Sequence, residues 1–210
     1  MPERCCLSAP CVYQLRVVLR GVSPLVWRRL LVCGDSTVAD LHAVFQLCFG
    51  WSDEHLHRFV IHGREYGIAH LGGVAFRDDA RRVRLDRLAL RTGERFVYEY
   101  DFYDCWMHDV RVEQIVALVS GRRYPRCVGG RRAGPPEDCG GVWAFLEWRQ
   151  QHHLPAVAAR MAELLADEEL FEDHRQEAVE LCRWLTRDRF DRRALNRRLA
   201  GPADTHNSVA

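Results

Sequence analysis

The first regular pattern in the chain is an alternation of side chains between residues 12 and 19. Positions 13, 15, 17 and 19 are Tyr, Leu, Val and Leu, whereas the positions between them include Gln14 and Arg16. Side chains that alternate in this way point to opposite faces of a β-strand. The pattern predicts a strand here, a turn over residues 21–24, and a second strand over residues 26–32.

The spacing of apolar residues then changes to that of a helix. After Asp35 or Ser36, either of which can cap a helix, the apolar side chains share one helical face. They are Val38, Leu41, Val44, Phe45 and Cys48. Gly50 follows, as is usual just beyond a helix C-terminus. We therefore expect a single helix in the N-terminal half of the chain.

The rest of the chain predicts strands first and helices last. Residues 55–67 are strand-like with a turn near Gly63, residues 69–82 are typical of a loop, and residues 85–90 are typical of a short helix. Further strands are expected over 95–102 and 107–115, and helices over 142–151, 155–165, 171–185 and 192–199. This order predicts an α+β fold, with a mixed or mainly antiparallel sheet and a C-terminal helical layer. We expect one domain over residues 12–200, a flexible N-terminus (1–11) and a disordered tail (201–210).

Composition narrows the class of protein. The formal net charge is +1, and all 30 basic residues are arginines, which a GC-rich coding bias explains more simply than selection for nucleic-acid binding. Nine cysteines without regular spacing favour reduced thiols. No window has the ~18 apolar residues of a membrane span, and the N-terminus lacks the apolar segment of a secretory signal. These features predict a cytoplasmic protein without a membrane partner.

Five segments occur in an order that resembles one family. They are "YQLRVVLRGVSPLVWRRLLV", "LHAVFQLCFGWSDEHLHRFVIHGREYG", "YEYDFYDCWMHDVRVE", "YPRCVGGRRAGPPEDCGG" and "LTRDRFDRRALNRRL". The chain resembles the plasmid pRiA4b ORF-3-like family, whose members are also labelled IS1096-element passenger TnpR proteins. The resemblance runs from Val12 to Leu199. It implies a bacterial protein linked to plasmids and mobile elements, and brings no established activity with it.

Two positions depart from the family pattern. The family usually reads Phe-Gly-Asp-Asp-Trp-x-His, where this chain has Tyr103 and Cys105 at the second and fourth places. Many members carry a cysteine directly before the paired prolines, and this chain has Gly134 there.

The resolvase label can be tested against the chemistry of recombinases. A serine recombinase needs a nucleophilic serine beside clustered arginines, but Ser8, Ser23 and Ser36 lie in an end, a turn and a helix cap. A tyrosine recombinase needs a C-terminal tyrosine, and none follows Tyr124. We therefore expect neither kind of recombinase.

The segment "WSDEHLHRF" contains the first candidate site, with Asp53, His55 and His57. On a strand, His55 and His57 share one face, so their imidazoles can ligate one metal ion. Alternatively, the two histidines pair with polar groups where a strand begins, while Trp51 packs in the core.

The segment "YDFYDCWMHD" contains a second candidate. Asp101, Asp104, His108 and Asp109 surround a tight turn beside Trp106. A carboxylate can orient a histidine for base catalysis or metal binding. The alternative is that the aspartates satisfy backbone groups of the turn.

The segment "GPPEDCGGVW" contains a third. Cys127, Cys139 and His108 are candidate zinc ligands, although Gly134 replaces the third cysteine of many relatives. Alternatively, Pro135 and Pro136 stiffen a loop, and Glu137 and Asp138 add negative charge before a helix that starts near Gly140.

These candidates lead to one spatial and two functional hypotheses. We expect the turn at Asp104 and the segment at Asp138 to line one cleft, with His55 or His57 at its rim and a raised pKa for His108. The first functional hypothesis is a non-enzymatic binding or accessory module with a protein or nucleic-acid partner. The alternative is a metal-assisted hydrolase that uses the Asp104/His108 and Cys127/Cys139 segments.

Overall fold

The structure is a computed structural model that describes residues 10–69, 75–151, 153–187 and 189–201. The expected flexible N-terminus and disordered tail lie almost entirely outside these ranges. Cys11 is an exception, because the first strand begins there.

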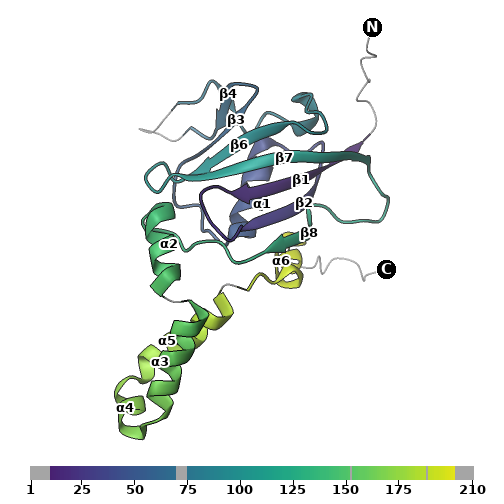
Figure 1. Ribbon diagram of the computed structural model, residues 1–210. Helices are drawn as coiled ribbons and strands as arrows, with labels where there is room; N and C mark the ends of the chain where they lie inside the picture. The colour runs from purple at the N-terminus through teal and green to yellow at the C-terminus, as the bar shows by residue number, and fades with distance from the viewer. Residues whose placement is uncertain (1–9, 70–74, 152, 188, 202–210) are drawn as a thin grey trace, which may run out of the picture.

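An eight-stranded sheet forms the centre of the fold (Figure 1). Its strands are β1 (Cys11–Leu19), β2 (Trp27–Cys33), β3 (His57–Ile61), β4 (Arg64–Gly67), β5 (Asp78–Asp79), β6 (Arg95–Tyr100), β7 (Trp106–Ala117) and β8 (Arg126–Arg131). They lie in the order β5-β4-β3-β6-β7-β1-β2-β8. All neighbours are antiparallel except β4 and β5, so the sheet is mixed.

Helices complete the fold. They are α1 (Val38–Phe49), the 3-10 turn η1 (Leu85–Arg87), α2 (Gly141–Gln151), α3 (Leu154–Leu165), α4 (Glu168–Asp173), α5 (Arg175–Arg187) and α6 (Arg192–Leu199). Strands precede most of the helices along the chain, and the predicted α+β class is confirmed.

The alternation seen in the sequence separates the two faces of the sheet. One face is apolar and packs against α1, where Phe45 contacts Phe59 and Tyr98 with ring centroids 5.8 and 5.0 Å apart. The other face is polar and carries ion pairs, such as Arg29 with Glu113 (Nη2 to Oε1, 2.8 Å). Burial of the apolar face is the main favourable term that holds α1 on the sheet.

The start of α1 differs from the prediction. Thr37, rather than Asp35 or Ser36, is the N-cap residue, and its hydroxyl accepts a hydrogen bond from the Asp40 N–H at 3.0 Å. The Asp40 carboxylate in turn accepts from the Thr37 N–H at 2.8 Å. This reciprocal pair is a capping box, which satisfies two backbone donors at once. Gly50 ends α1 with a left-handed φ of 86°, as predicted.

Some elements did not follow from the pattern. β5 lies within the segment expected to be a loop, and β8 was not predicted. The single helix predicted over residues 171–185 is wrong, because the chain turns at His174 and forms α4 and α5. No glycine or proline marks this break. It allows α5 to pack back along α3.

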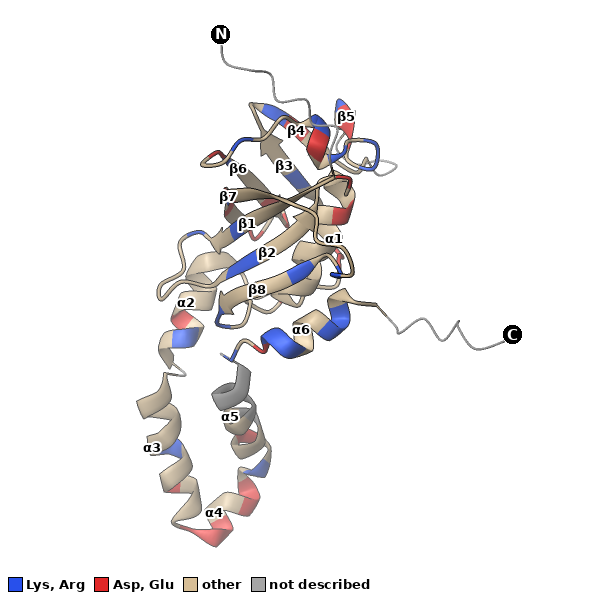
Figure 2. Cartoon of the chain, turned by 90° about the vertical axis from the view of Figure 1, so that its right-hand side faces the viewer, with Lys and Arg blue, Asp and Glu red and all other residues tan. Residues whose placement is uncertain are grey.

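The C-terminal helices occupy two places. α2 and α6 pack against the sheet core through residues such as Phe145 and Leu195. α3 to α5 extend beyond the sheet in both views (Figures 1 and 2) and bury a separate small cluster, which consists of Val157, Leu164, Ala178 and Leu181. We call α3 to α5 the helical arm. Within the described residues, none of the helices combines the length and apolar character that crossing a bilayer requires.

Candidate functional site

Three loops meet beside the start of α2. We call residues 51–56, 101–105 and 134–140 the loop junction. The Gly140 N–H donates to Asp104 Oδ2 at 3.1 Å, and His55 Nε2 lies 3.0 Å from Asp138 Oδ1. The structure therefore brings together the turn at Asp104, the segment at Asp138 and His55.

Glu137 fixes the third loop to the first. Its carboxylate accepts hydrogen bonds from the Ser52 N–H (2.9 Å), the Ser52 hydroxyl (2.5 Å) and the Tyr100 hydroxyl. Although burial acts in the opposite direction, the bonds from Ser52 and Tyr100 lower the pKa of Glu137. Burial, and then Glu137, raise the pKa of Tyr100. The indole N–H of Trp51 also donates to the Pro135 carbonyl at 2.9 Å. Glu137 and Trp51 thus hold the proline-rich loop in place.

Three aspartates and one cysteine adopt left-handed backbone conformations around this junction. Positive φ angles occur at Asp53 (64°), Asp101 (55°), Cys105 (53°) and Asp138 (54°). Aspartate tolerates the left-handed region better than most residues, because its short side chain bonds locally. Such conformations persist only where surrounding contacts impose them, and they concentrate at functional sites.

His55, Asp101 and Asp138 form one cluster of possible metal ligands. Their ligand atoms all lie within 4.8 Å of one another. His55 Nε2 is 3.9 Å from Asp101 Oδ2, and the Asp101 side chain is buried whereas that of Asp138 is 68% exposed. The cluster therefore opens to solvent on the Asp138 side.

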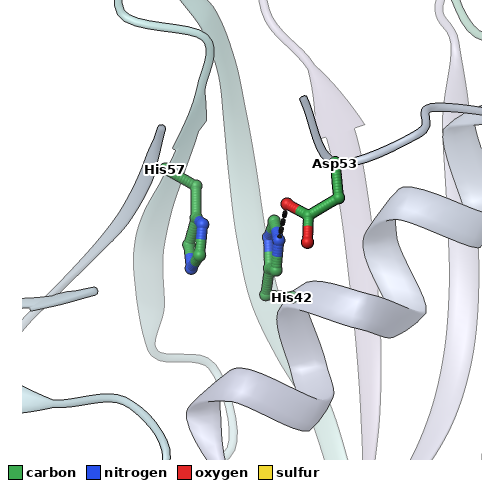
Figure 3. Close-up of side chains that lie close together, drawn as sticks. All are labelled: His42, Asp53 and His57. Carbon is green, nitrogen blue, oxygen red and sulfur yellow. Dashed lines mark hydrogen bonds and ion pairs between the residues drawn. The ribbon is translucent and has the colours of Figure 1, made fainter. Parts of the chain in front are cut away.

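His57 belongs to a different cluster, with His42 and Asp53 (Figure 3). The imidazoles of His42 and His57 are stacked, with centroids 3.4 Å apart and planes 7° apart. His42 Nε2 lies 2.7 Å from Asp53 Oδ1. His55 and His57 do not share a site, because β3 begins only at His57 and His55 remains in the preceding loop.

His42 was not among the residues singled out in the sequence. It lies on the buried side of α1, beside Leu41 and Phe45, and has an exposed fraction of 3%. A histidine on the apolar face of a predicted helix is the signal that marks it.

His108 and Trp106 lie in the core rather than in a cleft. Both side chains are fully buried, and His108 Nδ1 is 3.0 Å from the Trp106 carbonyl. Phe49 and Trp51 pack against the His108 ring. The expected raised pKa of His108 is wrong, because burial lowers this pKa to about 3.

The expected zinc set does not assemble. Among the described residues, two clusters bring together three or more possible ligands, and neither contains Cys127, Cys139 or His108. Cys127 is buried and its thiol lies 3.2 Å from the Gly129 carbonyl. Burial raises the pKa of Cys139 to about 11, and that of Cys127 is also raised, so both thiols favour the protonated form. A hydrolase built on Asp104, His108, Cys127 and Cys139 therefore lacks a common centre.

A basic groove lies at the β8 edge of the sheet, between α6 and the segment before β8. Its volume is about 930 Å³. The lining residues are Arg122, Arg123, Tyr124, Pro125, Arg126, Cys127, Val128, Arg192, Arg193, Asn196, Arg197, Leu199 and Ala200. Six of these thirteen are arginines and none is acidic, so we call it the arginine groove.

The walls of the arginine groove are fixed by hydrogen bonds between α6 and β8. The Asn196 side chain accepts from the Cys127 N–H at 2.8 Å and donates to the Cys127 carbonyl at 2.9 Å. Arg192 donates to the Val128 carbonyl at 2.9 Å. Asp191 caps α6 through the N–H groups of Arg193 and Ala194. Figure 2 shows basic residues, coloured blue, along α6 where it lies beside β8.

Comparison with known proteins places the chain among relatives of unassigned function. It is 34% identical over 146 residues to "Uncharacterized protein y4hQ" of Sinorhizobium fredii (strain NBRC 101917 / NGR234), covering 69% of this chain and 75% of that protein. It is also similar to the crystal structure of the protein of unknown function MM3350 from Methanosarcina mazei Go1. That similarity has a TM-score of 0.62 and 32% identity, and covers 88% of this chain and 93% of the other.

The family model described as "Plasmid pRiA4b ORF-3-like protein" matches residues 11–198. This range includes the loop junction, both histidine clusters and nearly all of the arginine groove. The chain belongs to the plasmid pRiA4b ORF-3-like family.

Proposed function

We propose that the protein is a non-enzymatic binding module that holds the phosphate backbone of a nucleic acid in the arginine groove. The observation that carries this proposal is the gathering of six arginines, without an acidic residue, along one concave surface. The whole chain has a formal net charge of only +1, so this local excess of positive charge is not a reflection of the average composition.

The charges in the groove are available to a ligand. Within the described residues, none of the six arginines forms an ion pair with a carboxylate at 4.0 Å or less. Asp191 interacts with Arg197 only at longer range. Arginine presents a planar fork of donors that matches phosphate oxygens, and several such groups release counterions when they bind a polyanion.

The groove also offers an aromatic side chain. Tyr124 is half-buried among the arginines. An aromatic ring beside basic groups can stack on an unpaired base, and such stacking tolerates any sequence. This combination favours single-stranded nucleic acid over duplex.

The proposal is tested by fluorescence anisotropy with a labelled single-stranded oligonucleotide of mixed sequence, over a series of salt concentrations. A variant with Arg122→Ala, Arg193→Ala and Arg197→Ala is expected to bind at least 10-fold more weakly than the native protein. The slope of log K against log salt should flatten by about 2, because three phosphate contacts are lost at about 0.7 each.

The matched control replaces Arg64, Arg91 and Arg95 with alanine. These exposed residues lie on or next to β4 and β6, which β7, β1 and β2 separate from β8. The control changes the net charge by the same amount and is expected to bind like the native protein. Equal weakening in both variants, or native protein that does not bind the oligonucleotide, would contradict the proposal. If the native protein binds a duplex more tightly than the single-stranded oligonucleotide, the ligand of the groove is double-stranded rather than single-stranded nucleic acid.

A further inference from the structure

We propose that His42, Asp53 and His57 form a zinc site on the α1 side of the sheet. The three side chains come from α1, from the turn after α1 and from the first residue of β3. Their ligand atoms lie within 4.8 Å of one another. This site is independent of the arginine groove, which lies at the opposite end of the sheet order.

The donor set has the chemistry that zinc requires. Two imidazole nitrogens and one carboxylate oxygen are common zinc ligands, and three protein ligands leave a fourth position of a tetrahedral ion for water or another ligand. Two nitrogens bound about 2.0 Å from a tetrahedral ion lie about 3.3 Å apart. In the structure the two imidazole rings are stacked, with centroids 3.4 Å apart and planes 7° apart, so one ring must rotate for both nitrogens to point at one ion.

Surrounding groups hold the ligands in position. His42 Nδ1 lies 2.9 Å from the Tyr98 hydroxyl, which leaves Nε2 directed at Asp53 (Figure 3). A hydrogen bond to the second ring nitrogen is the usual way in which a protein orients a histidine ligand. Tyr98 is itself fixed, because Gln46 Nε2 donates to its hydroxyl at 3.0 Å.

The same Gln46 also fixes the carboxylate ligand. Its Oε1 accepts from the Asp53 N–H at 3.1 Å, which supports the left-handed φ of 64° at Asp53. This backbone conformation directs the Asp53 carboxylate back toward α1. The buried amide of Gln46 therefore positions Asp53 directly and His42 through Tyr98.

An ion can reach this position from solvent. The side chain of Asp53 is 57% exposed, whereas His42 and His57 are buried. The carboxylate thus lies at the mouth of the site and the two imidazoles form its interior wall.

The test uses the full-length chain, purified without a polyhistidine tag and treated with a chelator. Zinc is added during isothermal titration calorimetry, and cobalt is used in a parallel titration because its visible absorption reports tetrahedral coordination. We expect one ion per chain with a dissociation constant in the micromolar range or below. Zinc should also raise the thermal midpoint of the native protein.

The decisive variant is Asp53→Asn, and its matched control is Asp138→Asn. Both aspartates are exposed, have a positive φ and contact a histidine, and asparagine tolerates this backbone conformation. Asp53→Asn should weaken zinc binding at least 10-fold and remove the cobalt absorption, while Asp138→Asn binds as tightly as the native chain. Circular dichroism of both variants checks that they remain folded.

Three results would overturn the proposal. The first is native protein that binds no zinc with one-to-one stoichiometry. The second is Asp53→Asn that binds zinc as the native chain does. The third is loss of binding in Asp138→Asn alone, which would assign the ion to His55, Asp101 and Asp138 instead. His57→Gln provides an independent variant, and should reduce zinc affinity without changing binding of the oligonucleotide to the arginine groove.

Discussion

At the scale of single residues, burial determines the protonation of His108. This side chain has no exposed surface and packs between aromatic rings from α1 and the following turn. Its folded pKa is lowered from 6.5 to about 3. Below pH 6.5 the unfolded chain therefore binds a proton at this residue that the folded chain does not bind. The stability contributed by the neutral form is complete above pH 6.5 and falls as the pH decreases toward 3.

We predict that His108→Gln flattens the dependence of stability on pH. Between pH 6.5 and pH 5, the neutral state of His108 should lower the free energy of unfolding of the native protein by about 2 kcal/mol, at about 1.4 kcal/mol per pH unit. The variant will be less stable at pH 7 because it disturbs the core, but its further loss on acidification should be smaller. Urea unfolding at pH 7, 6 and 5, followed by tryptophan fluorescence, measures this slope.

His62→Asn serves as the control for this measurement. His62 is exposed and has a φ of 51°, which asparagine accepts. It is unfolded under the same conditions, as a variant that loses an imidazole at the surface instead of in the core. Parallel curves for His108→Gln and the native chain would show that another group causes the acid sensitivity.

Residues of the loop junction were partly predictable from the sequence. Asp101, Asp104, Glu137 and Asp138 stood out as polar residues in turns, and the structure brings their segments together around His55. The assignment of His108 failed because the two-residue alternation of β7 places it on the same buried face as Trp106 and Val110. Long-range pairings, such as Glu137 with Ser52 and Tyr100, leave no local pattern.

At the scale of elements, the join between α6 and β8 depends on one side chain. Asn196 uses both its carbonyl and its amino group to bond the backbone of Cys127, as a neighbouring strand would. Removal of this side chain leaves two backbone groups of β8 without these partners. An unsatisfied group of this kind costs about 1–3 kcal/mol when it is buried.

Asn196→Ala is accordingly expected to reduce the free energy of unfolding by about 2 kcal/mol, since two bonds of about 1 kcal/mol are lost. It should also weaken oligonucleotide binding, because α6 carries three of the groove's arginines. Arg198→Ala is the matched control on the exposed side of α6 and should change stability by less than ~0.5 kcal/mol. Thermal and urea unfolding measure the difference. Equal stability of the two variants would mean that α6 does not depend on Asn196.

Long and regular elements were the ones that the sequence predicted. The alternation in β1 and the apolar face of α1 extend over several repeats, so each has a clear period. β8 has the sequence RCVGGR, in which two glycines interrupt any alternation, and β5 has only two residues. Such short strands form because neighbouring strands supply their hydrogen bonds, which is information that the local sequence does not contain.

At the scale of the whole molecule, the chain has two hydrophobic clusters of unequal size. The large one lies between the sheet and α1, α2 and α6, and the small one lies inside the helical arm. Because the two clusters are separate, the helical arm can lose its packing without removing side chains from the main core. We therefore expect the arm to open at a lower free energy than the sheet.

Leu164→Ala tests this expectation. Leu164 is fully buried in the arm, and its truncation should cost the arm about 2–5 kcal/mol. Hydrogen exchange measured by mass spectrometry should become faster across α3 to α5 and stay unchanged in β1, β6 and β7. The neighbouring Leu165 is 67% exposed, so Leu165→Ala should leave both regions as they are. Faster exchange throughout the strands in Leu164→Ala would show that the chain unfolds as one unit.

The position of α6 also bears on self-association of the chain. β8 is the last strand of the sheet, and an uncovered last strand can pair with the same strand of another molecule. The bonds from Asn196 and Arg192 occupy backbone groups of Cys127 and Val128 on this outer edge. Detachment of α6 would therefore expose the edge of β8 as a template for intermolecular sheet formation. A polyanion that bridges α6 and residues 122–126 would act against this, and so would protect the chain from aggregation.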